Sequence, residues 1–395
     1  MSPHESINDP ATGWAGMRRG QRRRPGEWLA EKGIFLVSLS AIVMVFLIFL
    51  FVARESLPLL LGRVDASAAR TPMTMAQLNA LPAPELAKLL DLEASELATM
   101  QRSEPETVKL LIEAKFDEIA AAPTDKDGAL NPVAWRYLLG PQQWTGYDRP
   151  VYVWQPISQI HKYNLVPLIV GSLKATLVAL LFSVPFSLCA AIYVSQLSSV
   201  RTREWLKPAI EMLAGIPSVV LGFFALIVMA SVLYPLYPDK SRLNAVVAGL
   251  ALGFAIIPVV FSIAEDALTS VPRSYTQAAL ALGASKWQAA WKVVLPAAIP
   301  GVFAAVVLGF GRAIGETMIV LLASGNAAFV SWDLLDSVRT LTATIAAEMG
   351  EAVKGDHHYQ MLFLIGTLLF AVTFASNLVA DLVIHRLKAR LEGRG

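Results

Sequence analysis

An arginine and a glutamate stand four residues apart in the otherwise apolar stretch 309–318. A charged side chain at the centre of a membrane costs about 2.5–3.5 kcal/mol on insertion scales, so such residues pair with one another or face water. On a helix, Arg312 and Glu316 share one face and can pair. An arginine also offers planar N–H donors to an oxyanion, while a nearby carboxylate limits how tightly the anion is held. The two residues are therefore a structural ion pair or part of an anion path.

Three other polar side chains in apolar runs are candidates for the same path: Lys174, Ser218 and Thr317. The alternative for the lysine is to extend its stem toward the membrane surface, and the hydroxyls can bond their own helix backbone. Gly311 and Gly315 form a small-xxx-small pattern, which lets a second helix approach closely.

Six apolar runs must position these residues, and each is long enough as a helix to cross a bilayer core of about 30 Å. The runs cover about 33–53, 166–194, 209–234, 243–264, 293–323 and 361–384. Of the 395 residues 55% are hydrophobic and only 16% charged, which excludes an ordinary soluble enzyme. We therefore expect an all-α, multi-pass protein of the plasma (inner) membrane.

Lysine and arginine favour the cytoplasmic side in short flanking segments. They concentrate in the N-terminal tail 1–32 and after the second, fourth and sixth runs, so both termini are predicted to be cytoplasmic, including the tail 388–395. The basic cluster within 18–24 suits this topology, or anionic lipid, better than nucleic acid. The first run, 33–53, is expected to remain as an anchor because its length exceeds that of a signal-peptide core.

The segment 62–164 is predicted to be an extracytoplasmic helical insert followed by a loop. Within it, Ser103 and Glu106 have the spacing of a capping box. The aromatic residues of 131–167 favour a loop at the membrane interface. His357 and His358 are interpreted as solvated residues, and neither a metal site nor a catalytic group is predicted.

The segment 265–296, called the coupling loop below, contains two short helical stretches joined at Gly283, where the absence of a β-carbon lets the chain turn. Its pattern comprises Gln277, Ala278, Ala279, Gly283, Val293, Leu295 and Pro296. This spacing resembles the loop by which ABC importer permeases dock onto their ATPase subunit. Gln277 stands where that family has glutamate, which leaves any salt bridge at this position open.

The residues 214–220, 311–318 and 323–326 resemble the permeases of phosphate-specific ABC importers, more the PstC type than the PstA type. The resemblance covers 165–387 well and implies a type I ABC importer permease core there, with phosphate as cargo. It also places Arg312 and Glu316 in the translocation path. The insert 62–130 is not part of the usual pattern, so its role is not inferred.

The resemblance further implies several partners: a second permease subunit, two copies of an ABC ATPase, and an extracytoplasmic phosphate-binding protein. The sequence contains no Gly-x-x-x-x-Gly-Lys-Ser/Thr phosphate cradle, so this chain is not expected to hydrolyse ATP. ATP and Mg²⁺ are expected on the partner ATPase, and no cofactor on this chain. Two alternatives stay open: a permease for another oxyanion such as sulfate or molybdate, and a membrane scaffold or sensor of phosphate status.

Overall fold

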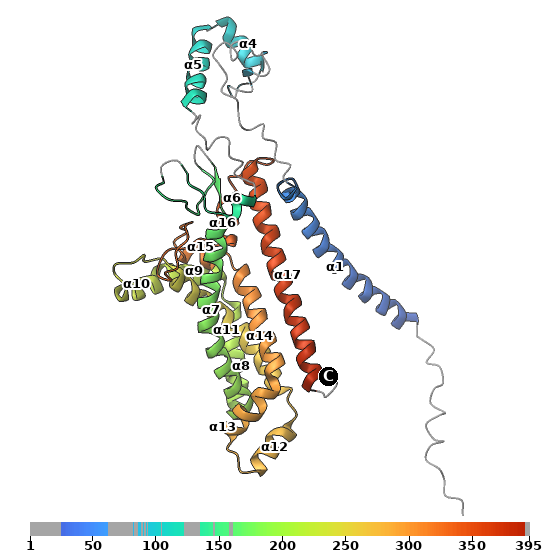
Figure 1. Cartoon of the computed structure of the whole chain (residues 1–395). Helices are drawn as coiled ribbons and strands as arrows, with labels where there is room; N and C mark the ends of the chain where they lie inside the picture. Colours follow the sequence, from blue (N-terminus) through green and yellow to red (C-terminus); the bar gives the residue numbers. More distant parts are fainter. Residues whose placement is uncertain are drawn as a thin grey trace, which may run out of the picture. The chain divides into compact units, whose positions relative to one another are not determined.

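The computed structural model describes residues 25–61, 82, 86–87, 90, 92, 94–103, 105–121, 135–144, 147–157 and 161–391 (Figure 1). Backbone contacts divide the chain into two units, Met1–Phe51 and Val52–Gly395, which are described separately. The described elements are helices apart from one two-stranded antiparallel sheet, so the predicted helical class is confirmed. The basic cluster at 18–24 and most of 62–93 lie outside the described residues.

Six helices among the described residues are long and apolar enough to cross a membrane, as the sequence predicts. They are Glu31–Leu59, Val166–Leu197, Ser218–Leu236, Ala245–Thr269, Lys286–Gly315 and His357–Ile384.

Two predicted boundaries are wrong because the backbone leaves the helical conformation. The third span starts at Ser218 rather than near 209, since Pro217 is extended at φ −58° and ψ 136°. The residues before it form a separate helix, α8 (Val200–Met212). The fifth span ends at Gly315 rather than 323, since Glu316 is extended at φ −70° and ψ 134°.

The first unit contains most of α1 (Pro25–Leu60). Its apolar side chains are exposed, Ile34 to 68% and Phe46 to 58% for example. The hydroxyls of Ser38 and Ser40 donate to carbonyls of their own helix, which satisfies them without water. An apolar helix with internally satisfied polar groups is the form a lipid environment requires.

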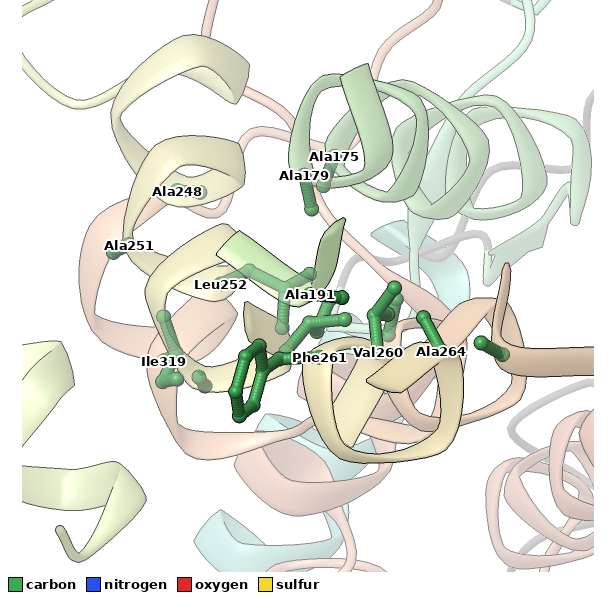
Figure 2. Close-up of a cluster of buried hydrophobic side chains, with 14 of the residues drawn as sticks. Ala175, Ala179, Ala191, Ala248, Ala251, Leu252, Val260, Phe261, Ala264 and Ile319 are labelled. Carbon is green, nitrogen blue, oxygen red and sulfur yellow. The ribbon is translucent and has the colours of Figure 1, made fainter. Parts of the chain in front are cut away.

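The core of the second unit lies around α11 (Ala245–Thr269), which packs against α7 (Val166–Ile192) and α14 (Leu295–Gly315). Small residues fill the contacts, as Figure 2 shows for alanines of α7 and α11. A β-carbon on Gly249 would lie 2.5 Å from the Cβ of Val178, so α11 and α7 are closer than larger side chains permit. Close approach through small residues is the usual packing of helices in membranes.

Shorter elements surround this core. The third span consists of α9 (Ser218–Phe224), a π-helical turn (Ala225–Met229) and α10 (Ala230–Leu233). It packs against α15 (Met318–Ala323). Between them, a β-carbon on Gly222 would lie 3.1 Å from the carbonyl oxygen of Met318. The remaining helices of the core region are α16 (Leu341–Glu348) and α17 (His357–Leu391), and α17 packs against α14.

The segment between the first two spans contains α4 (Ala94–Ser103) and α5 (Pro105–Ala121). These helices share a small apolar core that includes Leu97, Val108 and Ile112. The predicted capping box is wrong: Ser103 is the last residue of α4, and its hydroxyl donates to the carbonyl of Thr99 at 3.0 Å.

The aromatic loop before the second span is more buried than predicted. It contains α6 (Trp135–Leu139) and two strands, β1 (Trp154–Gln155) and β2 (Lys162–Tyr163), that pair antiparallel. Trp144, Trp154 and Tyr163 are at most 4% exposed. These three aromatic side chains pack inside the protein rather than along a membrane surface.

Candidate functional site

Arg312 lies on α14, inside the apolar span Lys286–Gly315, and its side chain is exposed. Among the described residues, no group forms an ion pair or hydrogen bond with its guanidinium. A charged side chain inside a membrane-spanning segment is stable only beside water, an anion or another protein. The geometry thus leaves the Arg312 donors free for a ligand or a partner.

Glu316 is held differently from the prediction, because α14 ends before it. Its Oε1 accepts from the backbone N–H groups of Thr317 and Met318, at 3.1 and 3.2 Å, and so caps α15. Its carbonyl oxygen accepts from Thr342 Oγ1 at 2.8 Å. A carboxylate at a helix N-terminus is stabilised by the free N–H groups there. The predicted pairing of Arg312 with Glu316 is therefore absent from the structure.

The path candidates Thr317 and Ser218 are half-buried. The hydroxyl of Thr317 donates to the carbonyl of Gly315 at 3.4 Å. Ser218 is the first residue of α9, one turn before the Gly222 contact with α15. Gly311 lies beside α17, where a β-carbon would be 3.6 Å from Asn377 Oδ1, whereas Gly315 has no described neighbour within 4 Å of that position. The structure thus leaves the Gly315 side of α14 open.

Lys174 lies in a different environment, buried at 8% exposure on α7. Its ammonium donates to the carbonyl of Ser331 at 3.1 Å and to the carbonyl of Asp333. Lys240 bonds the Asp333 carboxylate at 2.7 Å and holds the pKa of that carboxyl below its usual range. Lys174 therefore anchors the loop between α15 and α16 to α7.

Replacing Lys174 with methionine is expected to destabilise the protein rather than to block transport. Two partly buried carbonyls would lose their donor, and an unsatisfied buried polar group costs up to about 1–3 kcal/mol. The midpoint of thermal unfolding of the purified complex should fall, while uptake per folded complex stays unchanged. Lys240→Met is the control, since its bond is exposed and such pairs contribute about 0–1 kcal/mol. Lost uptake per complex at an unchanged midpoint would instead assign Lys174 to the path.

The coupling loop forms two helices, α12 (Arg273–Ala281) and α13 (Lys286–Ala289), with a sharp turn between them. Gly283 has φ +88°, a left-handed conformation that glycine adopts without steric cost. The N–H of Gly283 bonds Leu280 O and the N–H of Ala284 bonds Ala279 O, which closes a Schellman motif. The predicted turn at Gly283 is present.

The start of α13 carries a capping box that sequence reasoning missed. Ser285 Oγ accepts from the N–H of Gln288, and Gln288 Oε1 accepts from the N–H of Ser285. The spacing Ser-x-x-Gln is the available signal. Both ends of the connection are thus fixed, so the turn presents a defined surface.

The coupling loop exposes several large apolar side chains beside polar ones such as Arg273 and Lys292. The exposed apolar side chains are Tyr275 (51%), Leu280 (39%), Leu282 (90%), Trp287 (56%) and Trp291 (48%). The rings of Trp287 and Trp291 stack with centroids 5.7 Å apart. Gln277, Ala278 and Pro296 are exposed and Leu295 is half-buried, but Ala279 is only 9% exposed. Ala279 therefore packs within the loop. A gathering of exposed aromatic and aliphatic residues is typical of a surface that contacts another protein or a membrane.

Glu265, near the end of α11, is a buried charge that sequence reasoning did not single out. Its carboxylate bonds Arg203 Nη2 at 2.6 Å and Lys207 Nζ at 2.7 Å, both on α8. The signal was available in the i, i+4 spacing of the two basic residues on α8. The bonds fix α8 against the helix that leads into the coupling loop.

A second buried charge cluster comprises Glu348, Arg339, Trp154 and His358. Arg339 Nη2 lies 2.7 Å from Glu348 Oε1, and Trp154 Nε1 donates to the same carboxylate. Burial raises the pKa of Glu348, while the positive charge of Arg339 lowers it. His358 Nε2 lies 3.5 Å from Glu348, so this histidine is packed inside the protein, contrary to the prediction. The cluster joins β1 to α16 and α17.

Apolar spans, a cation in one of them that has no partner among the described residues, and a loop with exposed apolar side chains are the features of an integral membrane transport subunit. The chain belongs to the family of binding-protein-dependent transport system inner membrane components, whose model matches residues 164–393. It is thus an inner-membrane, multi-pass component rather than a catalytic subunit. Within the described residues no group of three His, Cys, Asp or Glu could hold a metal ion.

Several relatives are similar to this chain over the same region. The probable ABC transporter permease protein YqgH of Bacillus subtilis is 33% identical over 60% of this chain and 76% of its own length. The phosphate transport system permease protein PstC of Xylella fastidiosa (strain 9a5c) is 34% identical over 61% and 78%. Among solved structures, the inward-facing MetNI methionine ABC transporter is 18% identical, with a TM-score of 0.44, over 56% of this chain and 95% of that one.

Proposed function

We propose that this chain is a permease subunit of an ATP-driven importer that moves inorganic phosphate across the inner membrane. The observation that carries the proposal is the Arg312 guanidinium inside an apolar span, for which the described part of the chain offers no partner. The sequence relatives support the choice of cargo, because several PstC phosphate permeases are 31–34% identical over about 60% of the chain. Both termini are proposed to be cytoplasmic.

The proposed complex contains a PstA-like second permease, two PstB-like ATPase subunits and a PstS-like binding protein outside the membrane. The apolar face of the coupling loop, with Leu282 most exposed, is the proposed docking surface for an ATPase subunit. ATP and Mg²⁺ bind to that subunit. The open Gly315 side of α14 is available to the second permease.

In this mechanism Arg312 and Glu316 have separate roles. Arg312 donates planar N–H groups to two oxygens of the anion, an arrangement that suits a tetrahedral oxyanion. The carboxylate of Glu316 is held at the start of α15. Its negative charge repels an anion nearby, so the anion does not stay bound there and the cargo is released. Because phosphate moves intact, no covalent step is required of this chain.

The test is uptake by the complete complex in proteoliposomes with the binding protein outside and ATP at the ATPase side. We expect labelled phosphate to accumulate only with ATP and loaded binding protein, and excess sulfate or molybdate not to compete. Competition by either oxyanion together with its transport would replace phosphate as cargo. An assembled complex that hydrolyses ATP without moving any oxyanion would support the scaffold or sensor alternative.

A further inference from the structure

Glu265 lies within the second unit with no exposed side-chain surface. Its carboxylate binds Arg203 and Lys207 from α8 and accepts from Thr269 Oγ1 at 2.9 Å. A buried carboxylate is costly unless it is paired and hydrogen-bonded, and here both oxygens have charged partners. The hydrogen bond from Lys207 to Glu265 also raises the pKa of the lysine, which keeps it charged.

Glu265 links the end of α11 to α8. It is the first residue of the coupling loop and lies one turn before Thr269, the last residue of α11. Its partners Arg203 and Lys207 are one turn apart on α8, whose Leu206 and Ile210 pack on the apolar core. A displacement of the end of α11 therefore acts on α8 through both ionic and apolar contacts.

From α8 the connection continues to the candidate path. A 3₁₀ turn, Leu213–Gly215, and the extended residue Pro217 join α8 to α9. The helix α9 packs on α15 at Gly222, and α15 is the helix that Glu316 caps. The coupling loop and Glu316 are thus joined by a continuous series of packed elements.

We propose that Glu265 is a positioning residue that transmits movement of the coupling loop through α8 to the substrate path. This inference rests on the proposed function, because it needs an ATPase that moves the loop. The paired carboxylate resists sliding between α8 and α11, since a displacement would leave the buried charge of Glu265 without partners, whereas Arg203 and Lys207 are partly exposed. Without the pair, the loop moves while α8 and α15 stay in place.

The test compares ATP hydrolysed per phosphate transported in the complete reconstituted complex. For Glu265→Gln we expect this ratio to rise about tenfold, within the range of coupling between linked sites. The amount of assembled complex should stay close to that of the unaltered protein. Glu265→Asp keeps the charge and is expected to restore most of the coupling. A purely structural role would lower the amount of complex without changing the ratio.

Asp266→Asn is the matched control. Asp266 bonds the same Lys207 at 3.1 Å, but its side chain is 72% exposed, so its contribution is small and the ratio should not change. Lys207→Met is measured in parallel and must also raise the ratio if Glu265→Gln fails to assemble. A normal ratio in both variants, with normal phosphate uptake by the unaltered complex, would overturn this inference alone. Absence of phosphate uptake by the unaltered complex would overturn the proposed function.

Discussion

Replacing Arg312 with glutamine is expected to lower ATP-dependent phosphate uptake about 100-fold or more while the complex still assembles. The guanidinium has no hydrogen-bond or ion-pair partner among the described residues, so its removal breaks no such bond there. The variant would lose hydrogen bonds to the anion. Each charge-assisted hydrogen bond contributes about 1.5–3 kcal/mol, and 1.4 kcal/mol corresponds to a factor of ten. Initial rates of phosphate uptake per assembled complex provide the measurement.

Two further variants show whether the loss of uptake is due to the guanidinium of Arg312 itself. Arg312→Lys keeps the charge but not the planar donors, so uptake should lie between those of Arg312→Gln and the unaltered complex. Arg149→Gln removes a cation from an exposed loop before β1 and should leave uptake unchanged. Normal uptake by an assembled Arg312→Gln complex would contradict an anion path at this residue.

The spans and the coupling-loop turn could be predicted because their signals are local. An apolar run of sufficient length requires a helix in a membrane, whatever surrounds it. The turn at Gly283 is likewise a local feature, since the chain after α12 turns at a residue that tolerates positive φ. The same reasoning recognised Arg312 as a charge that needs an explanation.

The missed contacts of Glu316, Lys174 and Trp154 involve partners far away in sequence. The helix break at Glu316 accompanies a bond from Thr342, 26 residues later, and Lys174 is held by carbonyls more than 150 residues away. Trp154 reaches Glu348 across 194 residues. Spacing on one helix cannot reveal such contacts. The i, i+4 rule predicted that Arg312 and Glu316 pair, but α14 ends at Gly315, before Glu316.

Gly283→Val is expected to uncouple ATP hydrolysis from phosphate transport. Valine in a left-handed conformation is strongly disfavoured, since even an unbranched residue costs about 1–2 kcal/mol there. Avoiding that strain opens the Schellman motif and displaces Leu282 from the docking face. ATP hydrolysis stimulated by loaded binding protein should fall several-fold, and phosphate transport should fall further. Gly283→Asn should retain part of both activities, because asparagine tolerates positive φ.

Gly355→Val is the control that distinguishes the effect of backbone strain in general from the effect of strain at the turn between α12 and α13. Gly355 also has positive φ, +90°, and open space around it, but it lies in the connection between α16 and α17. If the docking surface is what Gly283 maintains, Gly355→Val carries the same local strain and still couples hydrolysis to transport. Equal uncoupling by both variants would mean that valine acts through general destabilisation. Uncoupling by Gly283→Val alone would localise the ATPase contact to the turn between α12 and α13.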